Sequence, residues 1–169
     1  MRLFIAIHLS EEQKDALIDV QDQIFNQGIR GNYTTEDNLH LTLAFIGEYP
    51  DSDVVLEALD TVVFSPFPIT LSGFGNFKDL WWIGIKTSQE LQSLAKKVRR
   101  TLVENGIPYD RKKFSAHITI LRRADRIVTD ITIPQIASTI DHFSLMRSYR
   151  GKRDMIYTEI GRIDADNDH

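Results

Sequence analysis

Residues 38–48 read NLHLTLAFIGE, a stretch in which apolar side chains occupy almost every second position before a glycine. Successive side chains of a strand point to opposite faces, so this alternation predicts a strand from 39 to 46 that is buried on one side. The glycine is expected to end it. The side chains predicted for the buried face are Leu39, Leu41, Leu43 and Phe45, and those for the opposite face are His40, Thr42 and Ala44.

A second His-x-Thr triplet lies in residues 114–122, which read FSAHITILR and also predict a strand. His117 and Thr119 follow His40 and Thr42 by 77 residues in each case. We infer an internal repeat of two strand–helix–strand units, spanning about 2–47 and 80–123. Three structural landmarks repeat with the same separation: Ser10 with Thr87, Gln13 with Glu90, and Leu17 with Leu94.

Each predicted unit begins with an apolar strand and continues into a helix. Ser10 with Gln13, and Thr87 with Glu90, have the spacing of capping boxes at the two helix starts. The predicted fold class is α+β, with mostly antiparallel sheets and packed helices in a single domain over residues 1–169. Outside the units we expect a helix within 51–64, a short helix at 133–140, and strands at 69–74, 143–146 and 155–163.

The composition is that of an ordinary globular protein, with 42% hydrophobic and 26% charged residues. The chain has no cysteine, which excludes disulfides, thiolate metal sites and a cysteine nucleophile. No apolar run approaches the roughly 20 residues that cross a bilayer, and the N-terminus lacks the pattern of a signal peptide. We therefore expect a cytoplasmic protein that does not associate with membranes.

Charge is distributed unevenly along the chain. Residues 1–79 carry 4 basic and 13 acidic side chains, whereas residues 80–169 carry 16 basic and 11 acidic ones. The basic second half would suit an anionic ligand such as RNA. The same imbalance also arises by chance, because charges that cluster in sequence need not form a patch in space.

The paired triplets are the candidate catalytic motifs. In each, the histidine and the threonine point to the same side of a strand, roughly 6.6 Å apart. If the two strands face each other, one neutral imidazole can take a proton from water while one imidazolium protonates a leaving oxygen. The threonine hydroxyls can donate hydrogen bonds to phosphate oxygens. A single triplet is more often structural, but two at equivalent repeat positions favour phosphodiester hydrolysis by His40 and His117.

The sequence contains no Cys/His cluster, no His-Glu-x-x-His pattern and no compact Asp-rich loop with the spacing of metal ligands. A strained cyclic phosphate already favours in-line attack, so we expect neither a metal nor another cofactor. No lysine-centred adenylation motif supports an ATP-driven ligase.

At its two motifs the chain resembles the 2H phosphoesterase superfamily, and within it the bacterial and archaeal RNA 2′,3′-cyclic phosphodiesterases, historically called 2′-5′ RNA ligases. The chain departs from this branch at Ala116, where proline usually precedes the histidine. The resemblance covers nearly the whole chain: residues 1–7, 38–48 and 114–122, and a closing segment with Ser144, Ser148, Gly151 and Tyr157.

The resemblance implies a two-lobed, pseudo-symmetric fold with a central cleft that holds the motif side chains. It also implies hydrolysis of a 2′,3′-cyclic phosphate at an RNA end to a 2′-phosphate. In that reaction His40 would be the general acid and His117 the base, while Thr42 and Thr119 bind the substrate. We expect a monomer, because a cleft within one chain already completes the site.

Two further residues are candidate substrate contacts. Arg122 lies five residues after His117, on the opposite face of an ideal strand, and would reach the cleft through a bulge, a twist or the strand's end. The matching family position often contacts phosphate or nucleotide. Tyr33 precedes the first motif in a loop, where its ring could stack on a base. Phe45 is expected in the core.

Other interpretations of the same residues stay open. The substrate could be 2′-5′ linked RNA, cleaved or ligated, or an ADP-ribose cyclic phosphate. The chain could also be a nucleotide-binding module of the same fold without turnover, although a binding module has no need of both histidines.

Overall fold

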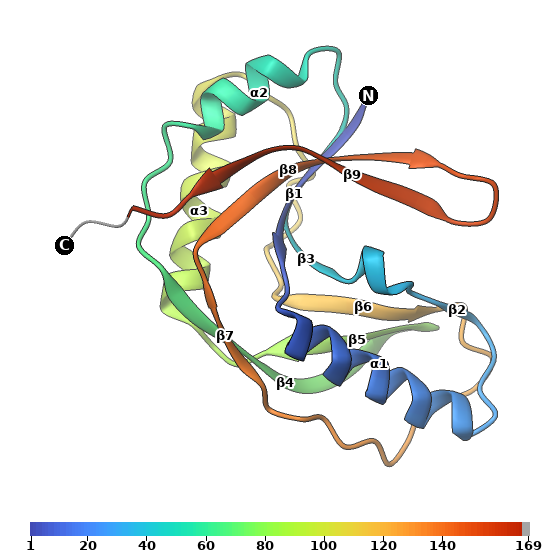
Figure 1. Cartoon of the computed structure of the whole chain (residues 1–169). Helices are drawn as coiled ribbons and strands as arrows, with labels where there is room; N and C mark the ends of the chain where they lie inside the picture. The colour runs from blue at the N-terminus through green and yellow to red at the C-terminus, as the bar shows by residue number, and fades with distance from the viewer. Residues whose placement is uncertain (167–169) are drawn as a thin grey trace.

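The computed structural model describes residues 1–166 and contains a four-stranded and a five-stranded sheet (Figure 1). All strand pairs are antiparallel, in the orders β3-β1-β8-β9 and β2-β6-β5-β4-β7, so the predicted α+β class is confirmed. The strands are β1 (Arg2–His8), β2 (Asn32–Tyr33), β3 (His40–Glu48), β4 (Phe67–Phe77), β5 (Leu80–Ile85), β6 (His117–Arg122), β7 (Ala137–Ile140), β8 (His142–Arg150) and β9 (Met155–Asp164). The helices are α1 (Glu11–Asn26), α2 (Ser52–Leu59), α3 (Gln89–Glu104) and the short 3-10 helix η1 (Glu36–Asn38).

The two strand–helix–strand segments occupy corresponding places in the two sheets. β1 pairs with β3 in the four-stranded sheet, and β5 pairs with β6 in the five-stranded sheet. Each intervening helix also contacts the sheet of the other segment: α1 contacts β6 of the five-stranded sheet, and α3 contacts β3 of the four-stranded sheet. Figure 1 shows α1 lying along the sheet of β4, β5 and β6. This crossed packing joins both sheets and the three α-helices in one large apolar cluster.

The first helix begins as predicted, and the second begins one residue later. The Ser10 hydroxyl accepts from the backbone N–H of Gln13 at 3.1 Å, and the Gln13 side chain accepts from the Ser10 N–H at 3.3 Å, so this capping box is confirmed. The prediction of a second capping box, formed by Thr87 and Glu90, is wrong. Because α3 starts at residue 89, the hydroxyl placed to cap it belongs to Ser88, which accepts from the Leu91 N–H at 3.1 Å.

The prediction of a short helix at 133–140 is also wrong. Residues 137–140 form β7, which pairs with β4 from Phe67 opposite Ile140 to Thr70 opposite Ala137. The free edge of β4 offers a row of backbone donors and acceptors, and pairing with it decides the conformation of this segment.

A β-bulge in β3 changes which side chains face the open side of the four-stranded sheet. Thr42 and Ala44 both have partners in β1, but the register skips Leu43 between them. The extra residue shifts the alternation by one, so Leu43 and Ala44 are both buried. Phe45 therefore shares the face of Thr42, and the predictions of a core Phe45 and an outward Ala44 are wrong.

The same irregularity occurs in β6. Thr119 and Leu121 have partners in β5, and the register skips Ile120. This bulge brings Arg122 onto the same face of β6 as His117, although the two residues are an odd number of positions apart. The skipped residue follows the motif histidine by three positions in both strands.

Within residues 1–166, no helix is long and apolar enough to cross a membrane.

Candidate active site

A cleft of about 690 Å³ opens between the two sheets, with β1, β3, β8 and β9 on one side and β2 and β6 on the other. In Figure 1 this region lies between the β8–β9 hairpin and the strands β6 and β2. The structure brings all the sequence-predicted site residues into this cleft: Tyr33, His40, Thr42, His117, Thr119 and Arg122.

His40 is held at both ring nitrogens. Its Nδ1 lies 2.7 Å from the carbonyl oxygen of Asn38, and its Nε2 lies 2.8 Å from the hydroxyl of Thr42. A carbonyl oxygen only accepts, so Nδ1 carries a proton and Nε2 of the neutral ring is the basic nitrogen. The Thr42 hydroxyl then donates to Nε2.

His117 is anchored in the corresponding way. Its Nδ1 lies 3.0 Å from the carbonyl oxygen of Ser115, two residues earlier, just as Asn38 precedes His40 by two. This bond leaves Nε2 of His117 as its basic nitrogen, by the same argument. The two motifs therefore present the same ring atom to one cleft from two different sheets.

Both imidazoles are neutral in the unliganded protein at pH 7. Burial, with smaller contributions from His8 and Arg122, lowers the pKa of His40 to about 4 against the opposing effect of the hydrogen bond to the Asn38 carbonyl. Burial also lowers the pKa of His117, again with a contribution from the Arg122 guanidinium. An anion bound between the rings would raise both pKa values.

Aromatic side chains surround the histidines, and the sequence analysis did not identify them as part of the site. The rings of Phe4 and Tyr157 lie 5.0 and 5.2 Å from the His40 ring, measured between centroids. Phe77 and Trp82 lie 5.9 and 6.0 Å from the His117 ring. These apolar neighbours account for the desolvation that lowers the pKa values. The closing segment with Tyr157 was noted only for its family resemblance.

The cleft is also lined by four exposed arginines, of which only Arg122 was predicted. Arg2 begins β1 opposite Ser148, Arg150 ends β8 and Arg153 lies in the β8–β9 turn, so all three come from one end of the four-stranded sheet. Within residues 1–166, none of the four forms an ion pair with a carboxylate. The sequence signal was the run of basic residues at 147–153, which the basic second half of the chain contains.

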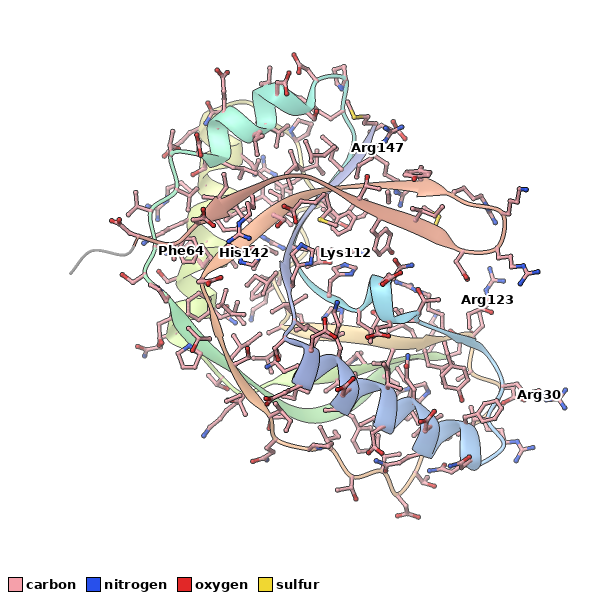
Figure 2. The ribbon with its side chains drawn as sticks, in the orientation of Figure 1. Arg30, Phe64, Lys112, Arg123, His142 and Arg147 are labelled. Carbon is pink, nitrogen blue, oxygen red and sulfur yellow. The ribbon has the colours of Figure 1, made fainter. Side chains whose placement is uncertain are left out.

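Tyr33 contributes its ring rather than its hydroxyl. The hydroxyl donates to the carbonyl oxygen of Ile29 at 2.7 Å, which fixes the ring at the cleft wall. Asn38 ties η1 to the β8–β9 hairpin, because its amide donates to the carbonyl oxygen of Met155 at 2.8 Å. Figure 2 shows Arg123, which follows β6, on the side of the molecule where the β8–β9 hairpin ends.

The remaining histidines of the described chain lie outside the cleft lining. His8 pairs with His40 across β1 and β3, and its Nε2 lies 3.4 Å from a carboxylate oxygen of Glu159. His142 Nδ1 bonds to Asp141 at 2.7 Å. In residues 1–166 no group of three or more His, Asp and Glu side chains is placed to hold a metal ion.

A family model described as the 2′-5′ RNA ligase superfamily matches residues 27–152. The chain belongs to this superfamily. The predicted membership in the 2H phosphoesterases is thereby confirmed, and the chain is an enzyme of the phosphoesterase class, as the motifs indicated.

Similar proteins of this superfamily share both sequence and fold with the chain. The RNA 2′,3′-cyclic phosphodiesterase of Thermotoga maritima is 31% identical over 163 residues, covering 88% of this chain and 87% of its own. That of Archaeoglobus fulgidus is 33% identical over 141 residues, 78% of each chain. The crystal structure of E. coli LigT complexed with 3′-AMP matches with a TM-score of 0.84 and 28% identity over 97% of both chains.

The low pKa of His40 predicts an acid-sensitive fold. An unfolded histidine titrates near 6.5 but the folded His40 near 4, so the unfolded state binds more protons in this window. The free energy of unfolding should therefore fall as pH drops from 6.5 to 4, by roughly 3 kcal/mol for this group. The His40→Gln variant should lose that much less over the same window in urea unfolding. An imidazole NMR titration of His40 with a midpoint near 6.5 would contradict the assignment.

Proposed function

We propose that this superfamily member hydrolyses a 2′,3′-cyclic phosphate at an RNA end to a 2′-phosphate by two-histidine acid–base catalysis. The observation that carries the proposal is the convergence of His40 and His117 in one cleft, each with Nδ1 held by a carbonyl so that Nε2 is its basic nitrogen. The names of the similar proteins support this choice of substrate.

In the proposed reaction Nε2 of His117 takes a proton from water, and the water oxygen attacks phosphorus. The bond from phosphorus to the 3′-oxygen breaks, and Nε2 of His40 donates its proton to that oxygen. Once Nε2 of His40 is protonated, the Thr42 hydroxyl no longer donates to it. That hydroxyl can then, with the Thr119 hydroxyl, donate to the non-bridging phosphate oxygens, whose charge the Arg122 guanidinium balances. His40 loses one proton and His117 gains one, so the pair still carries a single proton after the reaction, now on His117 instead of His40.

His40 must acquire a proton before it can act as the acid, although its pKa is about 4 in the free protein. The negative phosphodiester supplies the means, because a bound anion favours the charged imidazolium. Since the acid is stabilised only when the substrate is present, the buried ring avoids carrying a charge in the empty cleft. All the groups used come from one chain, which supports a monomeric enzyme.

The four arginines support an RNA end as the substrate in preference to a mononucleotide. A cyclic mononucleotide carries one phosphate, whereas an RNA end adds one phosphate for each further nucleotide. Arg122 lies with the motif residues, and Arg150 and Arg153 lie at the hairpin tip, where the chain upstream of the cyclic end can be bound.

The purified protein should open a short RNA carrying a 2′,3′-cyclic phosphate with EDTA present, giving a product that resists a 3′-specific phosphatase. Each of His40→Ala and His117→Ala should lower kcat by about 10²–10⁴-fold, as expected for loss of a general acid or base. His142→Ala is the matched control, since it removes a histidine outside the cleft, and should keep wild-type turnover. Normal turnover in either cleft variant would refute the mechanism, and a 3′-phosphate product would refute the direction of ring opening.

The pH dependence of kcat/KM should be bell-shaped, with its maximum below pH 6.5. The productive state carries one proton on the histidine pair, and both pKa values in the free protein lie below the ordinary 6.5. Above the higher of the two pKa values the proton is lost, so kcat/KM should fall about tenfold per pH unit. A profile of kcat/KM that stays flat up to pH 9 would show that no protonated histidine is required.

Arg150→Ala combined with Arg153→Ala should raise KM for a six-nucleotide RNA with a cyclic end far more than KM for a cyclic mononucleotide. The hairpin arginines are expected to bind phosphates upstream of the reacting one, so only the longer substrate loses contacts. The effect on KM should shrink as the salt concentration rises. Equal changes for both substrates would show instead that these arginines act at the reacting phosphate.

A further inference from the structure

Gln21 and Arg99 occupy corresponding roles on the two long helices, and neither side chain lines the cleft. Gln21 belongs to α1 and is 8% exposed. Its side-chain amide donates to the carbonyl oxygen of Ile120 at 2.9 Å and to that of Thr34 at 2.8 Å. Ile120 is the residue that the β-bulge of β6 leaves out of the ladder with β5.

Arg99 of α3 makes the matching pair of bonds in the other lobe. Its Nε donates to the carbonyl oxygen of Leu43 at 3.1 Å, and its Nη1 donates to that of Lys112 at 2.7 Å. Leu43 is the residue skipped by the bulge of β3. Lys112, labelled in Figure 2, lies in the loop that leads to β6.

The two pairs of bonds cross between the motifs. Gln21 joins the strand of His117 to the segment at Thr34, which leads to His40. Arg99 joins the strand of His40 to the segment at Lys112, which leads to His117. Each donor group thus holds one motif strand and the approach to the other motif at the same time.

The Arg99 guanidinium has further support from aromatic rings. Its central carbon lies 5.4 Å from the centroid of the Tyr109 ring and 5.8 Å from that of Phe114. Both rings belong to the loop between α3 and β6, so the planar group is fixed between that loop and β3. Its geometry, and not only its charge, determines which carbonyls it can reach.

We propose that Gln21 and Arg99 are positioning residues that hold the two bulged motif strands at the separation needed for proton transfer by His40 and His117. The inference rests on the proposed function of these histidines. A bulge sets the face on which Arg122 and Phe45 emerge, and a carbonyl left outside the ladder needs another donor. Arg99 supplies that donor for Leu43, whereas the Ile120 carbonyl accepts from the backbone N–H of Thr34 at 3.0 Å as well as from the Gln21 amide, which reinforces this junction. Losing either side chain therefore loosens a motif strand without touching the substrate.

The test compares Gln21→Met and Arg99→Met, which keep the length of the side chain and remove the donors. Gln13→Met is the matched control for the glutamine, because the buried Gln13 amide also donates to two carbonyls, those of Ile69 and Ile136, outside the motifs. Lys97→Met is the control for the arginine, because Lys97 lies on the same helix and donates to the Val63 carbonyl.

Both positioning variants should lower kcat about tenfold or more and change KM less than about threefold, because misplaced reacting groups slow chemistry more than binding. Both controls should stay close to the wild-type kcat, even where Gln13→Met lowers the unfolding temperature further than Gln21→Met does. Arg99→Lys keeps the charge but not the fork of donors, and should resemble Arg99→Met. Wild-type kcat in Gln21→Met and Arg99→Met, or restoration by Arg99→Lys, would overturn the proposal.

Imidazole NMR spectra provide a second measurement that does not depend on turnover. The signals of His40 and His117 should shift in the positioning variants and stay in place in the controls. If Gln21→Met does not fold, Gln21→Asn, which keeps the amide but shortens its reach, replaces it. An inactive wild-type protein would refute the proposed function, whereas unshifted imidazole signals in Arg99→Met would refute the positioning role alone.

Discussion

The cleft depends on a β-bulge at the same position of each of the two motif strands. Leu43 and Ile120 interrupt the ladders of β3 and β6 three residues after the motif histidines, and each interruption reverses the alternation that follows. Without the reversal, Phe45 would enter the core and Arg122 would face away from the cleft. The bulges therefore turn two ordinary half-buried strands into two walls that present histidine, threonine and a third side chain to one space.

The crossed helices make this arrangement possible. Each helix follows a strand of one sheet and packs against the other, so its polar side chains reach carbonyls that its own sheet does not contain. Buried polar groups need partners, and the helices provide them where the ladders cannot. The two lobes are thus connected by hydrogen bonds at the motif strands as well as by apolar packing.

The electrostatics of the cleft follow from its walls. Phe4 and Tyr157 pack against His40 and help to desolvate it, which keeps the ring neutral while the cleft is empty. The arginines around the opening carry positive charge that no carboxylate within residues 1–166 pairs with. A partly desolvated acid–base pair beside these arginines is suited to an anionic ligand whose own charge adjusts the protonation of the pair.

The sequence by itself determined most of the longer strands, the two long helices and the two His-x-Thr motifs, because alternation, helical spacing and capping are local patterns that local sequence can carry. The wrong predictions share a different cause. The cap at Ser88, the strand at 137–140 and the face of Phe45 each depend on a register or an edge supplied by a distant segment, as does the bulge that brings Arg122 to the cleft where it was expected. The aromatic shell and the arginine rim likewise came only from the tertiary structure, because side chains from β1, β8 and β9 meet the motifs only once the sheets have formed.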